Sequence, residues 1–525
     1  MKRWTPSVAC SPREERVLKL TKNRKLYAFL RRRRHELFDA EFQDELSTMY
    51  RDTGAGDDPV PPALMCMALL LQGYTRVSDS EAVACAVLDA RWQVVLGCVG
   101  DDEEPFSQGG LQQFRERLIR HDMDRRLLER TVELAKKTKE FDWKKLPKDL
   151  RLAVDSRPFE GAGRVEDTFN LLGHGARKLV QCVSKLTGRP FAQLCEAAGI
   201  PVLLATSVKT GLDVDWNNPS EKVTALVKLV GQVDSLADWV EREFADSMEK
   251  PLTHHIEALQ RIKAQNVDQP EADDAQMHDG VAKDRQVSVE DPEMRHGRKT
   301  KSRLFNGFKE HIGVDLDTGL ILACSIMPAN QAEALGAVPL KEDIDRQGFR
   351  IAELHTDLGY LHSPVVAEVL RAGGEIVSKP WPSHGRDGRV GKVDFHLNMR
   401  DRTATCPAGQ TKEFQLDEVV TFDPQVCDRC PFREQCTTAP LGKGRSLSIA
   451  ADEPLQQRLQ RQLKTKAGRA RLRQRTGVEH RLAHMASRQG KRARYRGCRK
   501  NTYDARRTAS LLNLERINQK VAAAQ

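Results

Sequence analysis

One acidic residue stands alone in a strongly basic stretch of this sequence. Residues 455–503 contain sixteen lysines and arginines but a single carboxylate, Glu479. A surface with this charge favours contact with phosphate groups. A carboxylate kept within it is best explained as an oxygen ligand of a divalent metal ion, completed by two carboxylates from elsewhere in the chain. The sequence therefore predicts a metal site beside a surface that binds nucleic acid.

Two aspartates at the ends of predicted strands are the candidates for those further ligands. Residues 150–155 have the apolar alternation of a strand that ends at Asp155, and residues 349–357 form another that ends at Asp357. Three carboxylates that meet at one point repel one another unless cations separate them. Two Mg²⁺ or Mn²⁺ ions there could carry out phosphoryl transfer without a protein nucleophile. Other carboxylates fit less well, because they flank a predicted turn or follow no strand: Asp315, Asp317, Glu166 and Asp167.

A second group of potential metal ligands is formed by four cysteines. Cys406 is followed by Cys427, Cys430 and Cys436, and the CxxC pair within this set has the spacing of a zinc knuckle. Four thiolates leave no open coordination position, so a Zn²⁺ ion here would be structural. The alternative is four reduced thiols in a small insertion.

The composition bounds the class of protein. The chain has 525 residues, a net charge of +10 and a sequence pI of about 9.0, which favour several domains and a polyanionic partner. No apolar run approaches the roughly 20 residues of a membrane span, and no apolar core follows the first four residues. We therefore expect a cytoplasmic protein without membrane contact. The twelve cysteines do not form a disulfide framework in that compartment.

The order of predicted elements indicates how the acids are positioned. Residues 1–145 are predicted to be all-helical and rich in arginine, and we interpret them as a DNA-binding domain. Residues 146–525 then contain a strand with Asp155, a hairpin, a strand with Asp357, a helix and a strand. The basic stretch follows as two predicted helices, one over residues 455–475 and one that starts after Gly477 and carries Glu479. A helical insertion with a polar loop, 166–292, and a cysteine-bearing insertion, 381–454, interrupt this order. The fold class is therefore α/β, with a ribonuclease H-like mixed sheet.

Four stretches of the chain carry a resemblance to a known family. They are Ala153–Ser156, Arg295–Lys299 leading into Phe305–His311, Thr356–Tyr360, and Arg475–His480. With these stretches in this order, the chain resembles bacterial insertion-sequence transposases of the DDE type over nearly its whole length. The resemblance implies that Asp155, Asp357 and Glu479 form a metal-binding triad. It also implies nicking at the element ends, followed by attack of the freed 3′-hydroxyl on target DNA.

The resemblance also suggests which basic residues hold DNA. Related transposases carry an arginine four residues before the catalytic glutamate, and Arg475 matches that position. They also carry a tyrosine and a lysine at the positions of Leu472 and Ala486, so this chain departs from the pattern there. Arg481, Arg488 and Lys491 are candidates to replace that lysine. Arg298, Lys299 and Lys309 are further predicted phosphate contacts.

Two other functions are compatible with the same residues. A metal-dependent nuclease would use the same core without joining the 3′ end to a target. A transposase-derived repressor would bind DNA without catalysis, but it has no reason to keep all three acids. We therefore predict a transposase whose partners are element ends and target DNA, working as a homodimer on paired ends.

Overall fold

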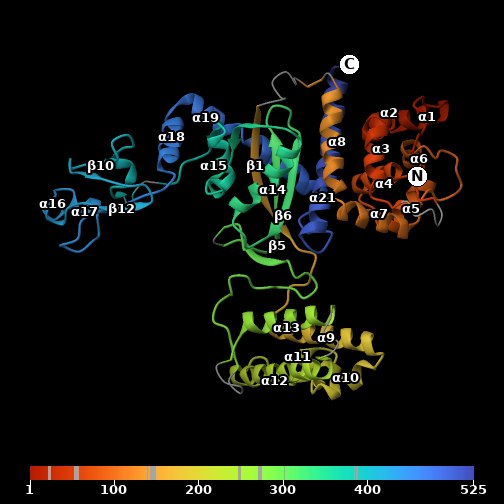
Figure 1. Cartoon of the computed structure of the whole chain (residues 1–525), viewed down its shortest axis with the longest axis horizontal. Helices are drawn as coiled ribbons and strands as arrows, with labels where there is room; N and C mark the ends of the chain where they lie inside the picture. Colours follow the sequence, from red (N-terminus) through yellow and green to blue (C-terminus); the bar gives the residue numbers. More distant parts are fainter. Residues whose placement is uncertain are drawn as a thin grey trace.

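A mixed β-sheet lies at the centre of the molecule, and three other parts of the chain surround it (Figure 1). The computed structural model describes all residues except 22–24, 52–57, 139, 142–148, 246–249, 270–274, 301, 383–384, 386–387 and 525. The predicted α/β class and the helical amino-terminal part are confirmed. The predicted domain boundary at residues 145 and 146 lies outside the described residues.

The sheet joins antiparallel and parallel strands on the two sides of β1 (Leu150–Glu160). On one side, β1 pairs antiparallel with β5 (Leu304–Asp315), whose other edge is shared by β6 (Ile321–Pro328) and β4 (Arg295–Arg298). On the other side, β1 pairs parallel with β7 (Ile351–His355), which pairs parallel with β8 (Glu375–Val377). The predicted hairpin is therefore present as β5 and β6, and the predicted strand–helix–strand unit is present as the parallel strands β7 and β8.

Helices complete the central part of the molecule. Helix α14 (Glu333–Arg346) connects β6 to β7, and α15 (Pro364–Arg371) connects β7 to β8. Buried apolar residues of β1, α14 and β7 belong to one core, which includes Leu152, Ile344 and Leu354. Helix α20 (Thr476–Gln489) packs across β1 and β5 through Val478, Leu482 and Met485.

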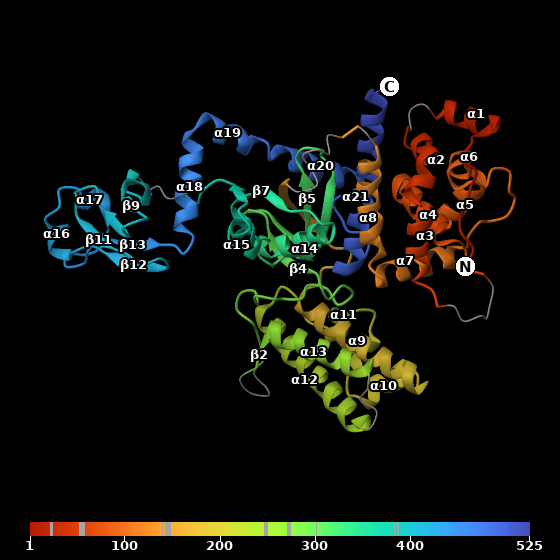
Figure 2. The same ribbon diagram turned by 45° about the horizontal axis from the view of Figure 1, so that its top comes forward.

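In its described residues the amino-terminal module contains eight helices, α1 to α8, on the side of the sheet next to α21 (Figure 2). Its arginines are not a simple solvated face. Arg31 and Arg34 are buried, with exposed fractions of 1% and 2%. Arg31 pairs with Glu14, and Arg34 donates to the carbonyl oxygens of Ser7, Val94 and Val95. The bounds are α1 (Pro12–Leu20), α2 (Lys25–Leu37), α3 (Ala40–Ser47), α4 (Pro62–Thr75), α5 (Asp79–Leu88), α6 (Ala90–Leu96), α7 (Gln108–Arg120) and α8 (Met123–Lys137).

Helix α21 (Cys498–Ala524) fastens this module to the sheet. It lies beside α8 in both views (Figure 1, Figure 2) and packs on β6. The side chain of Asn513 donates to Thr131 Oγ1 of α8 at 3.0 Å and to the carbonyl oxygen of Ile321 of β6 at 2.8 Å. The buried guanidinium of Arg506 pairs with Asp124 at 3.2 Å and with Asp343 at 3.0 Å. One helix therefore contributes buried polar contacts to both parts.

The helical insertion between β1 and β4 has a core of its own. Its helices are α9 (Thr168–Thr187), α10 (Phe191–Ala197), α11 (Val208–Leu212), α12 (Pro219–Glu243) and α13 (Leu252–Asn266), with a 3₁₀ turn at Pro201–Leu204. The following segment, expected to be a loop, contains a short hairpin of β2 (Val267–Asp268) and β3 (Gln276–Met277). Of the acidic run predicted in this loop, residues 271–274 lie outside the described residues. Residues 166–292 carry 13 basic and 21 acidic side chains, a net charge of −8.

The cysteine-bearing subdomain projects from the side of the sheet that faces away from the amino-terminal module (Figure 1). Short antiparallel strands surround a small core that contains Phe395, Phe422 and Leu447. The strands are β9 (His396–Asn398), β10 (Thr403–Thr405), β11 (Thr411–Glu413), β12 (Glu418–Thr421) and β13 (Ser446–Ile449). Two short helices, α16 (Pro424–Asp428) and α17 (Arg433–Cys436), carry Cys427 and Cys436, and Cys430 lies between them.

The chain returns to the sheet through two helices where one was expected. The predicted helix over residues 455–475 is divided into α18 (Glu453–Lys464) and α19 (Lys466–Arg473). Thr465 has an extended backbone, and its hydroxyl accepts from the amide of Gly468, so it ends one helix and caps the next. Among the described residues, no helix combines the length and apolarity that a membrane crossing requires.

Candidate nucleic-acid cleavage site

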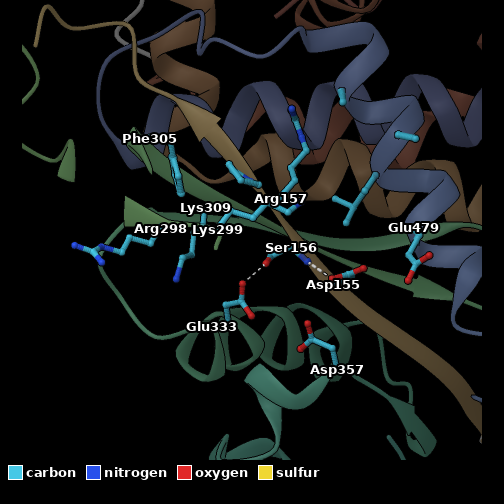
Figure 3. Close-up of a pocket in the computed structure, with 14 residues that line it drawn as sticks. Asp155, Ser156, Arg157, Arg298, Lys299, Phe305, Lys309, Glu333, Asp357 and Glu479 are labelled. Atoms are coloured by element: carbon cyan, nitrogen blue, oxygen red, sulfur yellow. Dashed lines mark hydrogen bonds between the residues drawn. The ribbon is translucent and has the colours of Figure 1, made fainter. Parts of the chain in front are cut away.

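The three predicted acids line a single cavity of about 520 Å³ (Figure 3). Asp155 comes from β1, Asp357 from the turn after β7, and Glu479 from the first turn of α20. The structure therefore brings together carboxylates from three distant parts of the chain. The remaining lining residues are Ser156, Arg157, Pro158, Arg298, Lys299, Phe305, Lys309, Glu333, Leu482, Ala483 and Ala486.

Asp155 does not end its strand, which corrects the prediction. Strand β1 continues to Glu160 because it stays paired with β5 throughout. Its pairing with β7, however, stops at Ala153 opposite His355. Asp155 therefore lies just past the carboxyl end of the parallel pair, where the edge of β1 opens towards the cavity. Sites of α/β sheets occur at this kind of edge.

Asp357 follows β7 at the same edge. One of its carboxylate oxygens, Oδ1, accepts a hydrogen bond from the amide of Gly359 at 3.0 Å and so caps the 3₁₀ turn Leu358–Tyr360. The turn fixes the orientation of a side chain that also lines the cavity. Burial raises the pKa of Asp357, and the nearby carboxylate of Glu333 raises it further.

Arg475 connects the other two acids. Its guanidinium donates to Glu479 Oε1 at 2.7 Å and to Asp155 Oδ2 at 3.3 Å. Burial raises the pKa of Asp155 to about 6, and the charges of Asp357 and Glu479 add to this, whereas Arg475 opposes it. A cationic group thus already lies between two of the three predicted metal ligands.

The donor set suits a divalent cation, although the side chains do not converge on one point. Carboxylate oxygens are the ligands that Mg²⁺ prefers, and all three acids face the same cavity. Within the described part of the chain, no three His, Cys, Asp or Glu side chains are spaced to hold a metal ion as they stand. Arg475 occupies the space between Asp155 and Glu479, so these two acids would close on an ion only after it moves.

The predicted DNA contacts divide into two groups. Arg298, Lys299 and Lys309 line the cavity together with the acids, and Arg298 and Lys299 are exposed. Arg488 instead pairs with Glu515, and Arg481 lies against the turn at Gly319. Neither lines the cavity, and the same is true of the exposed Lys491. These last three residues remain predictions that the geometry of the cavity does not favour.

A fourth carboxylate, Glu333, lines the cavity and was not among the predicted residues. It is the first residue of α14, and its Oε1 accepts a hydrogen bond from Ser156 Oγ at 2.9 Å. Ser156 lies opposite His311 in the sheet and also interacts with the buried hydroxyl of Tyr360, which is 2.6 Å from His311 Nδ1. No sequence signal singles out Glu333, because an acid in the first turn of a helix is common.

The two positions that depart from the family pattern have different surroundings. Ala486 lines the cavity, where its methyl group leaves space and offers no charge. Leu472 is half-buried on α19, outside the residues that line the cavity. The basic side chains that line the cavity therefore come from β1, β5 and the end of β4, as Arg157, Lys309, Arg298 and Lys299, and not from the position of Ala486.

The four cysteines of the projecting subdomain share a second, small cavity. Cys406, Cys427, Cys430 and Cys436 line it beside Phe422, which belongs to the core of this subdomain. Burial raises the pKa of Cys436, and the other three thiols raise it further. In their observed orientations, the four cysteine side chains are not spaced to hold a metal ion.

Two family models of transposase domains match separate parts of the chain. A family model described as a transposase DDE domain matches residues 405–518, which include Glu479 and the four cysteines. A second model, described as a transposase domain of the DUF772 type, matches residues 18–117 in the helical module. No match was found among curated proteins or among solved structures.

Proposed function

Because these two matches indicate an insertion-sequence transposase of the DDE type, we propose that the cavity cleaves DNA at the ends of an insertion sequence. The freed 3′-hydroxyl then attacks target DNA. The observation that carries this proposal is the meeting of Asp155, Asp357 and Glu479 in one cavity that basic side chains also line. A transposase domain implies DNA as the partner, and the basic residues fit its phosphates.

The topology of the sheet supports a ribonuclease H-like catalytic core. Three antiparallel strands, β6, β5 and β1, continue into the parallel strands β7 and β8. In this arrangement Asp155 lies on β1, Asp357 follows the neighbouring strand β7, and Glu479 lies on α20, which packs across β1. We therefore interpret the two insertions, 166–292 and 381–454, as additions to this core.

The residues of the cavity have separate tasks in the proposed reaction. Asp155, Asp357 and Glu479 would hold two Mg²⁺ or Mn²⁺ ions, which activate a water or a 3′-hydroxyl and stabilise the leaving oxygen. Arg298, Lys299 and Lys309 bind the phosphates on either side of the scissile bond and orient it. Arg475 releases the two acids that it pairs with and turns to a DNA phosphate.

The distribution of charge supports a DNA path along the helices that follow the cysteine-bearing subdomain. Residues 455–525 carry 20 basic and 3 acidic side chains, a net charge of +17. Residues 1–145 carry 26 basic and 24 acidic side chains, so this module is nearly neutral. We propose that α18, α19, α20 and the basic segment 491–500 provide most of the non-specific attraction. The helical module would then recognise the element end by shape or sequence.

A Zn²⁺ ion in the cysteine-bearing subdomain is part of the same proposal. The four thiols already line one cavity, and rotation of their side chains would bring them into contact with one ion. The ion would stabilise the folded state of this subdomain, whose apolar core is too small to be stable alone. A homodimer on paired ends also remains our proposal.

The test of the proposed function is DNA cleavage by a variant that lacks one ligand. Glu479→Gln should abolish Mg²⁺-dependent nicking of DNA that carries the element's terminal repeats, while binding to that DNA persists. Glu342→Gln is a matched control, because Glu342 is exposed on α14 and lies outside the cavity. Undiminished nicking by Glu479→Gln would exclude Glu479 from the site. Joined products with a target plasmid distinguish a transposase from a nuclease, and binding without any nicking by the unmodified protein would indicate a repressor.

A further inference from the structure

The four carboxylates of the cavity fall into two pairs with different partners. Asp155 and Glu479 share the guanidinium of Arg475. Asp357 and Glu333 form no ion pair with any described residue, because their hydrogen bonds come from the amide of Gly359 and the hydroxyl of Ser156. One half of the site therefore has an ion-paired cation, whereas the carboxylates of the other half are hydrogen-bonded to neutral donors, and Glu333 feels the charge of Lys309 without an ion pair to it.

Asp357 and Glu333 face each other across the backbone of Gly359. A Cβ atom added to this glycine would lie 2.2 Å from Glu333 Oε2 and 3.3 Å from Asp357 Oδ1. Figure 3 shows the two side chains pointing from the turn after β7 and from α14 into the same part of the cavity. Carboxylates in this arrangement repel each other unless a proton or a cation lies between them.

Ser156 fixes which oxygen of Glu333 is available. Its hydroxyl donates to Oε1, and this leaves Oε2 on the side of Gly359 and Asp357. Ser156 is itself held in β1, next to Asp155, and contacts the fully buried Tyr360. The position of Glu333 is thus determined by neighbours that do not belong to the predicted triad.

We propose that Glu333 is a fourth carboxylate ligand of the site, and that Glu333 and Asp357 together bind the divalent cation that enters before DNA. The inference rests on the proposed function, because it assigns an additional ligand to the same metal centre. It follows from the position of these two carboxylates on either side of Gly359 without an ion pair to a described residue, and from the affinity of Mg²⁺ and Mn²⁺ for carboxylate oxygens. The pair that Arg475 holds would complete its own site later, when DNA draws this arginine away.

Binding of Mn²⁺ to the full chain without DNA tests this assignment, and electron paramagnetic resonance can follow the titration. Glu333→Gln should weaken Mn²⁺ binding by about tenfold or more. Glu333→Asp keeps the charge but withdraws the carboxylate by one methylene, so it should also weaken binding. A role that is only electrostatic would leave the Asp variant unchanged. Glu342→Gln, with the same charge removed from the exposed face of α14, should bind Mn²⁺ like the unmodified protein.

Asp357→Asn separates the failure of this inference from the failure of the proposed function. If Asp357→Asn loses Mn²⁺ and both Glu333 variants bind it normally, Glu333 is not a ligand, although the site is a metal site. If neither position affects Mn²⁺ binding, neither carboxylate is a ligand in the absence of DNA and this inference fails. Undiminished Mg²⁺-dependent nicking by Asp357→Asn would then overturn the proposed function as well. Thermal unfolding of each variant identifies any that is misfolded, and the second Glu333 variant then supplies the result.

Discussion

Arg475 and Glu479 form an ion pair of 2.7 Å one helical turn apart, and the same guanidinium reaches Asp155 at 3.3 Å. The arginine is therefore a substitute cation for two acids that line the same cavity. This contact stabilises ionised carboxylates in the absence of metal. It also means that a divalent ion and Arg475 compete for the same oxygens.

Removal of this competitor should strengthen metal binding in the absence of DNA. For Arg475→Gln we expect Mn²⁺ to bind the free protein about tenfold more tightly, which corresponds to roughly 1.4 kcal/mol. Binding to terminal-repeat DNA should weaken, because a phosphate contact is lost. Calorimetric titration with Mn²⁺ measures the first effect. The exposed Arg473 is the control, since Arg473→Gln removes a neighbouring charge that forms no ion pair with a described residue. Weaker Mn²⁺ binding by Arg475→Gln would contradict the competition.

The junction between the helical module and the sheet should depend strongly on Arg506. Its guanidinium, with an exposed fraction of 7%, pairs with Asp124 and Asp343, whose exposed fractions are 2% and 3%. Arg506→Gln leaves these charges buried and should lower the free energy of unfolding by about 3–5 kcal/mol. Thermal unfolding followed by circular dichroism measures the loss. Lys500→Gln, an exposed position on the same helix, should unfold like the unmodified protein.

Asp291 should make the protein less stable at neutral pH than at mildly acidic pH. The side chain is fully buried, its Oδ2 has no hydrogen-bond partner among the described residues, and burial raises its pKa to about 6. A raised pKa means that the folded state favours the protonated acid. This stabilisation is present below about pH 4 and is lost as the pH rises through about 6.

Comparison with an uncharged variant isolates this effect. At pH 8, Asp291→Asn should have a free energy of unfolding about 1–3 kcal/mol higher than that of the unmodified protein, and therefore a higher unfolding temperature. The difference should vanish near pH 4. Asp279→Asn, in an exposed part of the same segment, should show no such pH dependence. An Asp291→Asn protein that is less stable at pH 8 would show that the ionised form is required.

The cysteine-bearing subdomain provides a prediction about metal content. Protein purified from a zinc-supplemented culture should contain one Zn²⁺ per chain, and Cys427→Ser should reduce this to a small fraction. The core around Phe422 should then unfold at a lower temperature or lose its cooperative transition. Mass spectrometry of the metal and thermal unfolding measure the two effects. Cys10→Ser, far from this subdomain in the sequence, is the control, and a zinc-free unmodified protein would favour four reduced thiols.

The sequence predicted those parts of the fold that depend on local pattern. The alternation around Ile312 and Ile321 identified the hairpin, and the apolar periodicity around Val366 identified α15. The sequence could not show that β1 continues past Asp155, because this extension depends on pairing with a strand more than a hundred residues away. The end of α18 at Thr465 was missed because capping by a threonine hydroxyl interrupts a helix without a proline or a glycine at the break.

The candidate site was predictable to a similar extent. Asp155, Asp357 and Glu479 could be selected because each follows a recognisable element, and the resemblance to a family fixed their order. Glu333 could not, since only the packing of α14 against the turn at Gly359 brings it beside Asp357. Arginine content was misleading at Arg31 and Arg34, because burial against carbonyl oxygens is invisible in a count of charges.

The bond between Asn513 and Thr131 joins residues that are 382 positions apart in the chain. During translation, at 5–20 residues per second, α8 would wait roughly 20 to 80 seconds for the helix that covers it. Throughout that interval its apolar side and the carboxylate of Asp124 stay uncovered, so the nascent chain is a substrate for chaperones and proteases. Any product that stops before α21 is synthesised would lack this cover permanently. Such fragments should be degraded rather than persist as competitors that occupy DNA without cutting it.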